Sequence, residues 1–133
     1  MAKLKVLVVG AAGFLAGRVL PTFRDRYDLV LLDVRRTNRD DEEVDGVVIA
    51  DLLDSDRGAY REHFRGVDVV VHCGAARPQK KGEPGHEKAD RRGDIRFQGR
   101  GHIRSDASFE QQMDNVRMAY NIYQTCIEES VRR

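Results

Sequence analysis

Four short runs of apolar, largely β-branched residues mark the first half of the chain. Continuous rather than alternating apolarity is typical of strands that are buried on both faces of a parallel sheet. The four runs span residues 3–10, 28–33, 46–50 and 67–72. Between the first two, apolar residues recur at helical spacing from Phe14 to about Arg26, and Pro21 is expected to kink or shorten this helix. The pattern therefore predicts a strand, a helix and three further strands.

A shorter helix is expected between the third and fourth strands. Asp54 is its predicted N-cap. Tyr60 and Phe64 stand four residues apart and so share one helical face, and Gly66 is expected to end the helix.

The C-terminal part of the chain predicts a long helix over residues 108–132. Ser108 and Gln111 fit a capping box, with the serine at the N-cap and the glutamine at the third helical position. Apolar residues then recur every three or four positions along one face, at Met113, Val116, Tyr120, Tyr123, Ile127 and Val131. We interpret these as packing residues rather than cofactor contacts.

Alternating strands and helices predict a doubly wound α/β fold with a parallel sheet. Right-handed crossovers place its strands in the order 3-2-1-4. The length of 133 residues suits a single domain over residues 1–133.

Residues 77–107 break this pattern and are interpreted as a polar, basic loop or insertion. Between residues 77 and 106, nine Lys or Arg stand against five Asp or Glu, and five of the twelve glycines lie here. A solvated excursion is the favoured interpretation, and a lid that faces a phosphate is the alternative.

Composition excludes several classes of protein. The net charge of +1 argues against binding of nucleic acid through phosphates. We expect no membrane partner and a cytoplasmic location, because the chain has no apolar run of membrane-spanning length and no signal-peptide layout. Cys73 and Cys126 lie far apart and predict neither a disulfide framework nor a metal site.

The candidate chemistry begins at the turn between the first strand and the first helix, which reads Gly10-Ala-Ala-Gly13-Phe-Leu-Ala16-Gly17. Glycine at the strand exit permits a tight turn, and a second small residue lets a pyrophosphate approach the backbone. Ala16 and Gly17 are expected to keep the helix close to the sheet. The strand–turn–helix context favours a dinucleotide site.

Asp33 ends the second strand, 23 positions after Gly10. A carboxylate there is expected to accept hydrogen bonds from the adenosine ribose hydroxyls and to repel a 2′-phosphate, which favours NAD over NADP. Arg35 and Arg36 follow closely and provide an alternative partner for a 2′-phosphate. The other interpretation of Asp33 is a strand-end residue that starts a turn.

Two further segments follow later strands. Asp51 is expected to accept from the adenine amino group while Leu52 packs against the ring, the alternative being that Asp51 caps a helix. The segment His72-Cys-Gly-Ala-Ala76 supplies small residues where a cofactor would cross the carboxyl edge of the sheet. His72 is interpreted as a packed, hydrogen-bonded histidine, and Cys73 as a small buried residue.

Together these segments, with Asn115-Val-Arg-Met-Ala-Tyr-Asn-Ile-Tyr, resemble the extended short-chain dehydrogenase/reductases and, within them, the NAD-dependent epimerase/dehydratase group. The resemblance covers residues 3–76 and 108–133. Val9 stands where the family usually has threonine, and Ala16 stands at its third glycine. The resemblance implies a Rossmann-like fold and NAD as cofactor.

The resemblance also implies a role for each candidate residue. The pyrophosphate would be cradled by Gly10, Ala12, Gly13 and Phe14. Asp33 would hold the ribose, Asp51 and Leu52 would receive adenine, and Ala75 and Ala76 would border the inner edge of the cofactor.

No catalytic residue is assigned. The family uses a Tyr-x-x-x-Lys pair that follows a fifth strand, and none of the tyrosines at 27, 60, 120 and 123 has a lysine four residues later. The chain ends where that strand is expected to begin, so the fold is expected to be truncated before it.

The sequence therefore supports two functional hypotheses. The first is the cofactor-binding part of an NAD-dependent epimerase, dehydratase or dehydrogenase, whose full-length form acts on a sugar or nucleotide sugar. The second is a non-catalytic NAD-binding module or truncated partner subunit. Because the helix at 108–132 resembles one used in the dimer bundle of the family, a homodimer through it is expected in either case.

Overall fold

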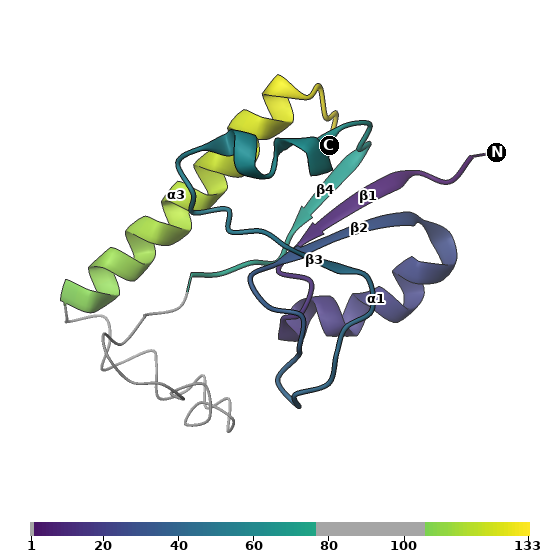
Figure 1. The fold of residues 1–133 in the computed structure, drawn as a ribbon, viewed down its shortest axis with the longest axis horizontal. Helices are drawn as coiled ribbons and strands as arrows, with labels where there is room; N and C mark the ends of the chain where they lie inside the picture. Colours follow the sequence, from purple (N-terminus) through teal and green to yellow (C-terminus); the bar gives the residue numbers. More distant parts are fainter. Residues whose placement is uncertain (1, 77–105) are drawn as a thin grey trace.

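The computed structural model describes residues 2–76 and 106–133 (Figure 1). Within these ranges the first half of the chain forms the strands and first helix that the apolar pattern predicts. In chain order the elements are β1 (Lys5–Val9), α1 (Phe14–Arg26), β2 (Asp28–Asp33), β3 (Val47–Ile49), the 3-10 helices η1 (Arg57–Ala59) and η2 (Arg61–Phe64), β4 (Val69–His72) and α3 (Asp106–Glu128).

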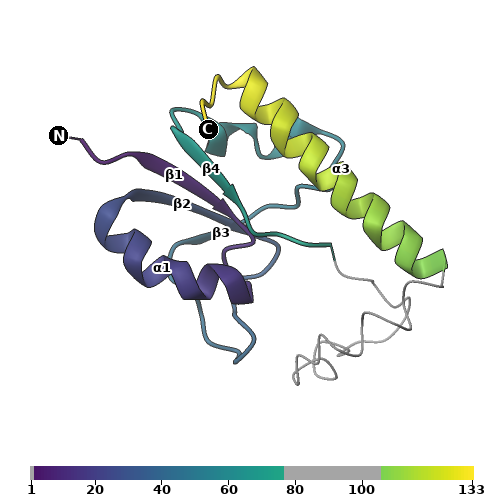
Figure 2. The same ribbon diagram turned by 180° about the vertical axis from the view of Figure 1, so that it is seen from behind.

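The four strands form one parallel sheet in the order β3-β2-β1-β4, as predicted. Helix α1 lies on one face of the sheet, and α3 lies on the other (Figures 1 and 2). Along β1, Val6 and Val8 pack into the core beside α1, whereas Leu7 and Val9 pack into the core beside α3. This two-sided burial explains why the run is continuously apolar.

Helix α1 begins and ends where the sequence predicts. Pro21 lies inside it, yet the helix continues to Arg26, so the expected shortening does not occur. Ala16 and Leu20 form its buried side. The prediction that Gly17 brings α1 close to the sheet is wrong, because Gly17 is exposed and an added Cβ would meet no atom within 4 Å.

Between β3 and β4 the chain forms two 3-10 helices instead of the predicted α-helix. Asp56, rather than Asp54, caps η1 by accepting from the backbone N–H of Gly58 at 2.9 Å. Asp54 instead accepts from the N–H of Asp56. These local side-chain bonds compete with the α-helical ladder. Tyr60 and Phe64 are fully buried, as a shared inward face would require.

Helix α3 begins at Asp106, so Ser108 is not its N-cap. The face predicted to pack is instead exposed. Its residues Met113, Val116, Tyr120, Tyr123 and Ile127 are 40–72% exposed. The side that packs on the sheet carries Met118, Asn121, Ile122, Thr125 and Cys126. Helical spacing identifies residues that share a face, but two stripes of α3 satisfy it, and only contact with the sheet decides between them.

Ion pairs hold the end of α3, and one backbone hydrogen bond holds the end of the chain. Arg57 and Arg61 both pair with Glu128 at the end of α3. Val131 packs against the core beyond the helix. The carbonyl of Arg133 accepts from the N–H of Val70 at 2.7 Å, so the end of the chain lies along β4.

Candidate functional site

The glycine turn after β1 is built around Gly10. Its φ of +76° lies in the left-handed region that favours glycine. The N–H groups of Gly10 and Ala11 both donate to the carbonyl of Leu32 at the end of β2. A Cβ on Gly10 would lie 2.7 Å from the Cα of Gly74, beyond β4. The turn thus brings the ends of β1, β2 and β4 together.

The turn leads directly into the N-terminus of α1. Gly13 is the N-cap, with no side-chain capping bond, and no acidic residue occupies the first helical turn. A Cβ on Gly13 would approach the carbonyl oxygen of Gly10 to 3.1 Å. The backbone N–H groups at a helix N-terminus and its positive dipole end favour an anion there. This geometry suits the pyrophosphate of a dinucleotide.

Asp33 lies beside the glycine turn at the end of β2, partly buried. Its Oδ2 accepts from the N–H of Ala12 at 2.9 Å, and its Oδ1 accepts from the N–H of Val34 at 2.7 Å. A carboxylate has about four lone-pair sites, so each oxygen retains acceptor capacity for a hydroxyl. The structure therefore joins the two parts of the predicted dinucleotide motif through one hydrogen bond.

The turn after β3 carries Asp51 and Leu52. It lies next to Asp33, because the N–H of Ala50 donates to the carbonyl of Asp33 at 2.9 Å. Asp51 is exposed, and its Oδ1 accepts from the N–H of Leu53. The side chain of Leu52 is only 3% exposed and packs in the core, so the prediction that it packs against the adenine ring is wrong.

The segment after β4 is held by α3. Ala75 is exposed and Ala76 is buried. The N–H of Ala76 donates to Oδ1 of Asn115 at 2.6 Å, and its carbonyl accepts from Nε2 of Gln111 at 3.0 Å. The N–H and the carbonyl of Ala76 are thus both hydrogen-bonded to α3, by two amide side chains that lie one helical turn apart. Sequence reasoning missed this clamp, although two amide side chains four positions apart on a helix are a detectable signal.

His72 and Cys73 lie at the same edge of the sheet. His72 is exposed, which contradicts the prediction of a packed ring, although Nδ1 does accept from the N–H of Gly74 at 3.3 Å. Partial desolvation lowers the pKa of His72. Cys73 is half-buried, and desolvation raises the pKa of its thiol. Desolvation therefore favours the neutral form of both groups.

Phe14 is 52% exposed at the start of α1. The guanidinium groups of Arg18 and Arg39 lie 5.2 and 5.1 Å from its ring centroid. Arg39 comes from the loop between β2 and β3 and was not among the predicted site residues. Its position adds a positive charge beside the glycine turn.

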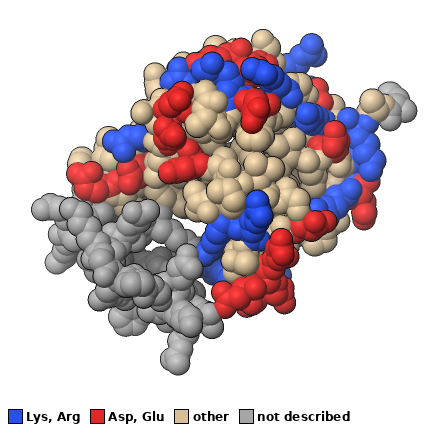
Figure 3. Space-filling view, in the orientation of Figure 1, with Lys and Arg blue, Asp and Glu red and all other residues tan. Residues whose placement is uncertain are grey.

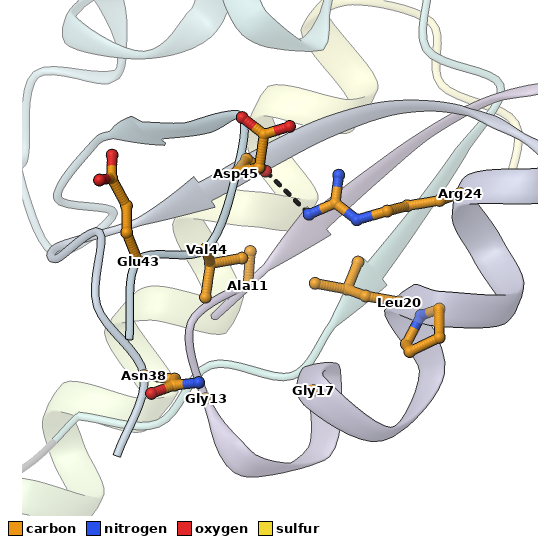
Figure 4. A pocket seen from close by; sticks show the side chains of 10 residues that line it. Ala11, Gly13, Gly17, Leu20, Arg24, Asn38, Glu43, Val44 and Asp45 are labelled. Carbon is orange, nitrogen blue, oxygen red and sulfur yellow. Dashed lines mark hydrogen bonds between the residues drawn. The ribbon is translucent and has the colours of Figure 1, made fainter. Parts of the chain in front are cut away.

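A groove of about 390 Å³ lies on the α1 side of this turn (Figure 4). Arg24 closes one end by donating to the carbonyl of Asp45 at 2.8 Å. Of the predicted cofactor residues, the groove includes only Gly13, so it is distinct from the site at the carboxyl edge of the strands. Its lining residues are Ala11, Gly13, Gly17, Leu20, Pro21, Arg24, Asn38, Glu43, Val44 and Asp45.

Within residues 2–76 and 106–133, no group of three or more His, Cys, Asp or Glu is arranged to hold a metal ion. Both cysteines are free thiols. None of the helices in the described part of the chain is both long and apolar enough to span a membrane.

Solved structures with the same fold are found by comparison. Uronate dehydrogenase from Agrobacterium tumefaciens superposes with a TM-score of 0.60 at 22% identity, over 98% of this chain and 38% of that one. A mutant of that enzyme complexed with NAD gives 0.57 at 23% identity, over 94% and 37%. UDP-N-acetylglucosamine 4-epimerase from Methanobrevibacter ruminantium, in complex with UDP-N-acetylmuramic acid, gives 0.58 at 15% identity, over 98% and 36%.

The chain thus spans less than two-fifths of the length of these structures, and at such identities the likeness shows the fold alone. Comparison with curated protein sequences gives no match. The sequence profile of the NAD dependent epimerase/dehydratase family, however, matches residues 6–91, which include the glycine turn, Asp33, Asp51 and the end of β4. This chain belongs to the NAD-dependent epimerase/dehydratase family, whose cofactor is NAD.

Proposed function

We propose that this chain is the NAD-binding part of an oxidoreductase that acts on a sugar, a sugar acid or a nucleotide sugar. The main observation behind the proposal is the hydrogen bond from the N–H of Ala12 to Asp33, which places a ribose acceptor directly beside the glycine turn at the N-terminus of α1. The sugar substrate is part of the enzyme hypothesis, in which the chain continues into a catalytic part. It is supported by family membership and by the substrates named for the uronate dehydrogenase and the epimerase of similar fold.

The described residues fit NAD without a change of side chain. The pyrophosphate would lie over Gly10, Ala12, Gly13 and Phe14, at the uncapped N-terminus of α1. Asp33 would accept from the ribose hydroxyls, and Asp51 would meet adenine from the exposed side of its turn, whereas the side chain of Leu52 faces the core. Ala75 and Ala76 would border the half of the cofactor that carries nicotinamide. When bound, NAD supplies a hydride acceptor.

The chain itself holds no Tyr-x-x-x-Lys pair to act as general acid and base. We therefore propose that it binds NAD but does not oxidise sugars by itself. The coding sequence beyond Arg133 separates the two functional hypotheses. A continuing reading frame that encodes such a pair would support the enzyme, whereas a stop codon would support a non-catalytic NAD-binding module or partner subunit.

One observation favours a role as a partner subunit or homodimer in either case. The exposed face of α3, formed by Met113, Val116, Tyr120, Tyr123 and Ile127, is a continuous apolar stripe along a helix. Exposed apolar patches commonly mark protein–protein interfaces. We propose that two copies of the chain pack through this face.

We also propose a cytoplasmic protein without nucleic-acid or membrane partners. Basic and acidic side chains are interspersed over the face shown in Figure 3, in keeping with the net charge of +1. Nucleic-acid binding proteins instead gather basic residues into a patch or stripe.

The binding proposal is tested by calorimetric titration of the 133-residue protein with NAD and, separately, with NADP. NAD is expected to bind, and NADP is expected to bind more weakly, because Asp33 would repel its 2′-phosphate. A protein that is folded by circular dichroism yet gives no heat with NAD at millimolar concentration would refute the proposal. NADH formation with a sugar would refute its non-catalytic part.

A further inference from the structure

Helix α3 presents a buried amide to the turn that follows β3. Asn121 is only 4% exposed. Its Nδ2 donates to the carbonyl of Leu52 at 2.8 Å and also approaches the carbonyl of Asp54 at 3.3 Å. One side chain thus contacts the backbone on both sides of Leu53, almost seventy residues away along the chain.

The same turn is held at a second point from the core. The hydroxyl of Tyr60 donates to the carbonyl of Asp54 at 3.2 Å, and the tyrosine ring is fully buried. The side chain of Leu52 packs in the same cluster as Tyr60 and Ile122, the neighbour of Asn121 in α3. The inner side of the turn is therefore fixed, while Asp51 on its outer side is exposed.

The hydrogen bonds of Asn121 matter because leaving a buried carbonyl without a donor destabilises the protein. This loss of stability is larger than the net stability that one hydrogen bond contributes. Without the amide, the carbonyl of Leu52 would have to find water. The turn would then move away from α3, and Asp51 would move with it.

We propose that Asn121 is a positioning residue for the adenine end of the cofactor. It contacts no ligand itself and acts by fixing the turn at residues 51–54. This inference rests on the proposed NAD-binding function.

A second set of contacts from α3 allows the role of Asn121 to be distinguished from a general effect on the helix. Asn115 and Gln111, further toward the N-terminus of the helix, bind the backbone of Ala76 on the nicotinamide side. The two loops thus have separate anchors on one helix. Loss of Asn121 should weaken binding of the adenine half, whereas loss of Asn115 should leave that half unaffected.

The experiment compares the dissociation constants of AMP and NAD for the 133-residue protein and three variants. Asn121→Leu should raise both constants about tenfold, the effect of one lost hydrogen bond with an unsatisfied partner. Asn115→Leu should raise the constant for NAD but not for AMP. Thr125→Val is the matched control, because this buried hydroxyl donates to the carbonyl of Asn121 within the helix rather than to the turn.

Tyr60→Phe keeps the buried ring and removes only the hydroxyl that donates to the carbonyl of Asp54. This variant tests the same turn if Asn121→Leu fails to fold. It should raise the constant for AMP about threefold, as expected for a weaker neutral hydrogen bond. An unchanged constant for AMP in the folded variants, or an equal rise in Thr125→Val, would overturn the role of Asn121. Failure of the unaltered protein to bind AMP and NAD would instead overturn the proposed function, and this inference with it.

Discussion

The backbones of Gly10 and Gly74 lie in contact where β1 and β4 leave the sheet. A Cβ on Gly10 would come within 2.7 Å of both the Cα and the N atom of Gly74. Gly10 also has a φ of +76°. Two independent constraints thus require glycine at position 10, and the loops after β1 and β4 can approach each other this closely because Gly10 has no side chain.

Replacing Gly10 by alanine should destabilise the protein by roughly 2–4 kcal/mol, from left-handed strain together with overpacking against backbone. The expected result is a lower urea midpoint, measured by circular dichroism, and loss of NAD binding. The matched control is Gly17→Ala in α1, where an added Cβ meets no atom within 4 Å. It should raise stability by about 0.5–1 kcal/mol, the helix propensity difference. Equal effects of the two substitutions would contradict this account.

Replacing Asp33 by asparagine should weaken NAD binding about 10- to 100-fold, the effect of losing hydrogen bonds to a charged acceptor. An amide offers one acceptor atom, whereas the two carboxylate oxygens serve Ala12 and Val34. The preference for NAD over NADP should also fall, since the negative charge is removed. Calorimetric titration of both cofactors measures the two effects.

Asp28→Asn is the control for that substitution, because Asp28 is an exposed carboxylate at the opposite end of the same strand. It should leave both affinities unchanged. A similar loss in the two variants would indicate a general effect of charge on the sheet rather than a ribose contact.

Replacing Tyr123 by glutamate on the exposed face of α3 should abolish self-association. Tyr123 is 66% exposed in the chain, so the fold should tolerate the charge, whereas an apolar interface would not. Sedimentation velocity measures the change in mass. Arg117→Gln makes the same change in net charge at an exposed position of α3 about 120° around the helix from Tyr123, and should leave the mass unchanged. A monomeric unaltered protein would refute the homodimer.

Glu128 should make stability depend on pH in the acid range. Its hydrogen bond with Arg57 holds its pKa below the ordinary value of 4.5. A group whose pKa is lowered by folding stabilises the fold above its unfolded pKa, and the contribution is lost as pH falls through the lower, folded value. The melting temperature of Glu128→Gln should therefore fall less between pH 5 and lower pH than that of the unaltered protein. Glu110→Gln removes the same charge near the other end of α3 and is the matched control, and identical melting curves for the two variants would contradict this account.

The sheet and α1 were predictable from sequence because their signals are local. A strand buried on both faces needs a continuous apolar run, and Gly10 and Asp33 occupy strand ends that parallel pairing brings to one edge. That edge is where the structure joins Asp33 to Ala12. The strand order, predicted from right-handed crossovers in a doubly wound sheet, is confirmed.

The layer formed by α3 was less predictable, because it depends on contacts between distant parts of the chain. The apolar stripe at Tyr120 and Tyr123 is as regular as the buried one, and it is the sheet that selects Ile122 instead. The hydrogen bonds from the amide of Asn121 to the carbonyls of Leu52 and Asp54 leave no periodic signal. Residues 77–105, which include nearly all of the predicted loop, lie outside the described residues.

The alternation of β1 between the two cores has a consequence for folding. Val6 and Val8 belong to one cluster and Leu7 and Val9 to the other, so each layer loses part of its interior if this strand separates from the sheet. Adjacent residues of β1 thus pack in opposite layers. If one helical layer opens, the β1 residues that it exposes are bonded directly to residues that hold the other layer. The two layers therefore form a single cooperative unit through four consecutive residues of β1, and the amide protons of this strand should be the slowest in the described chain to exchange with solvent.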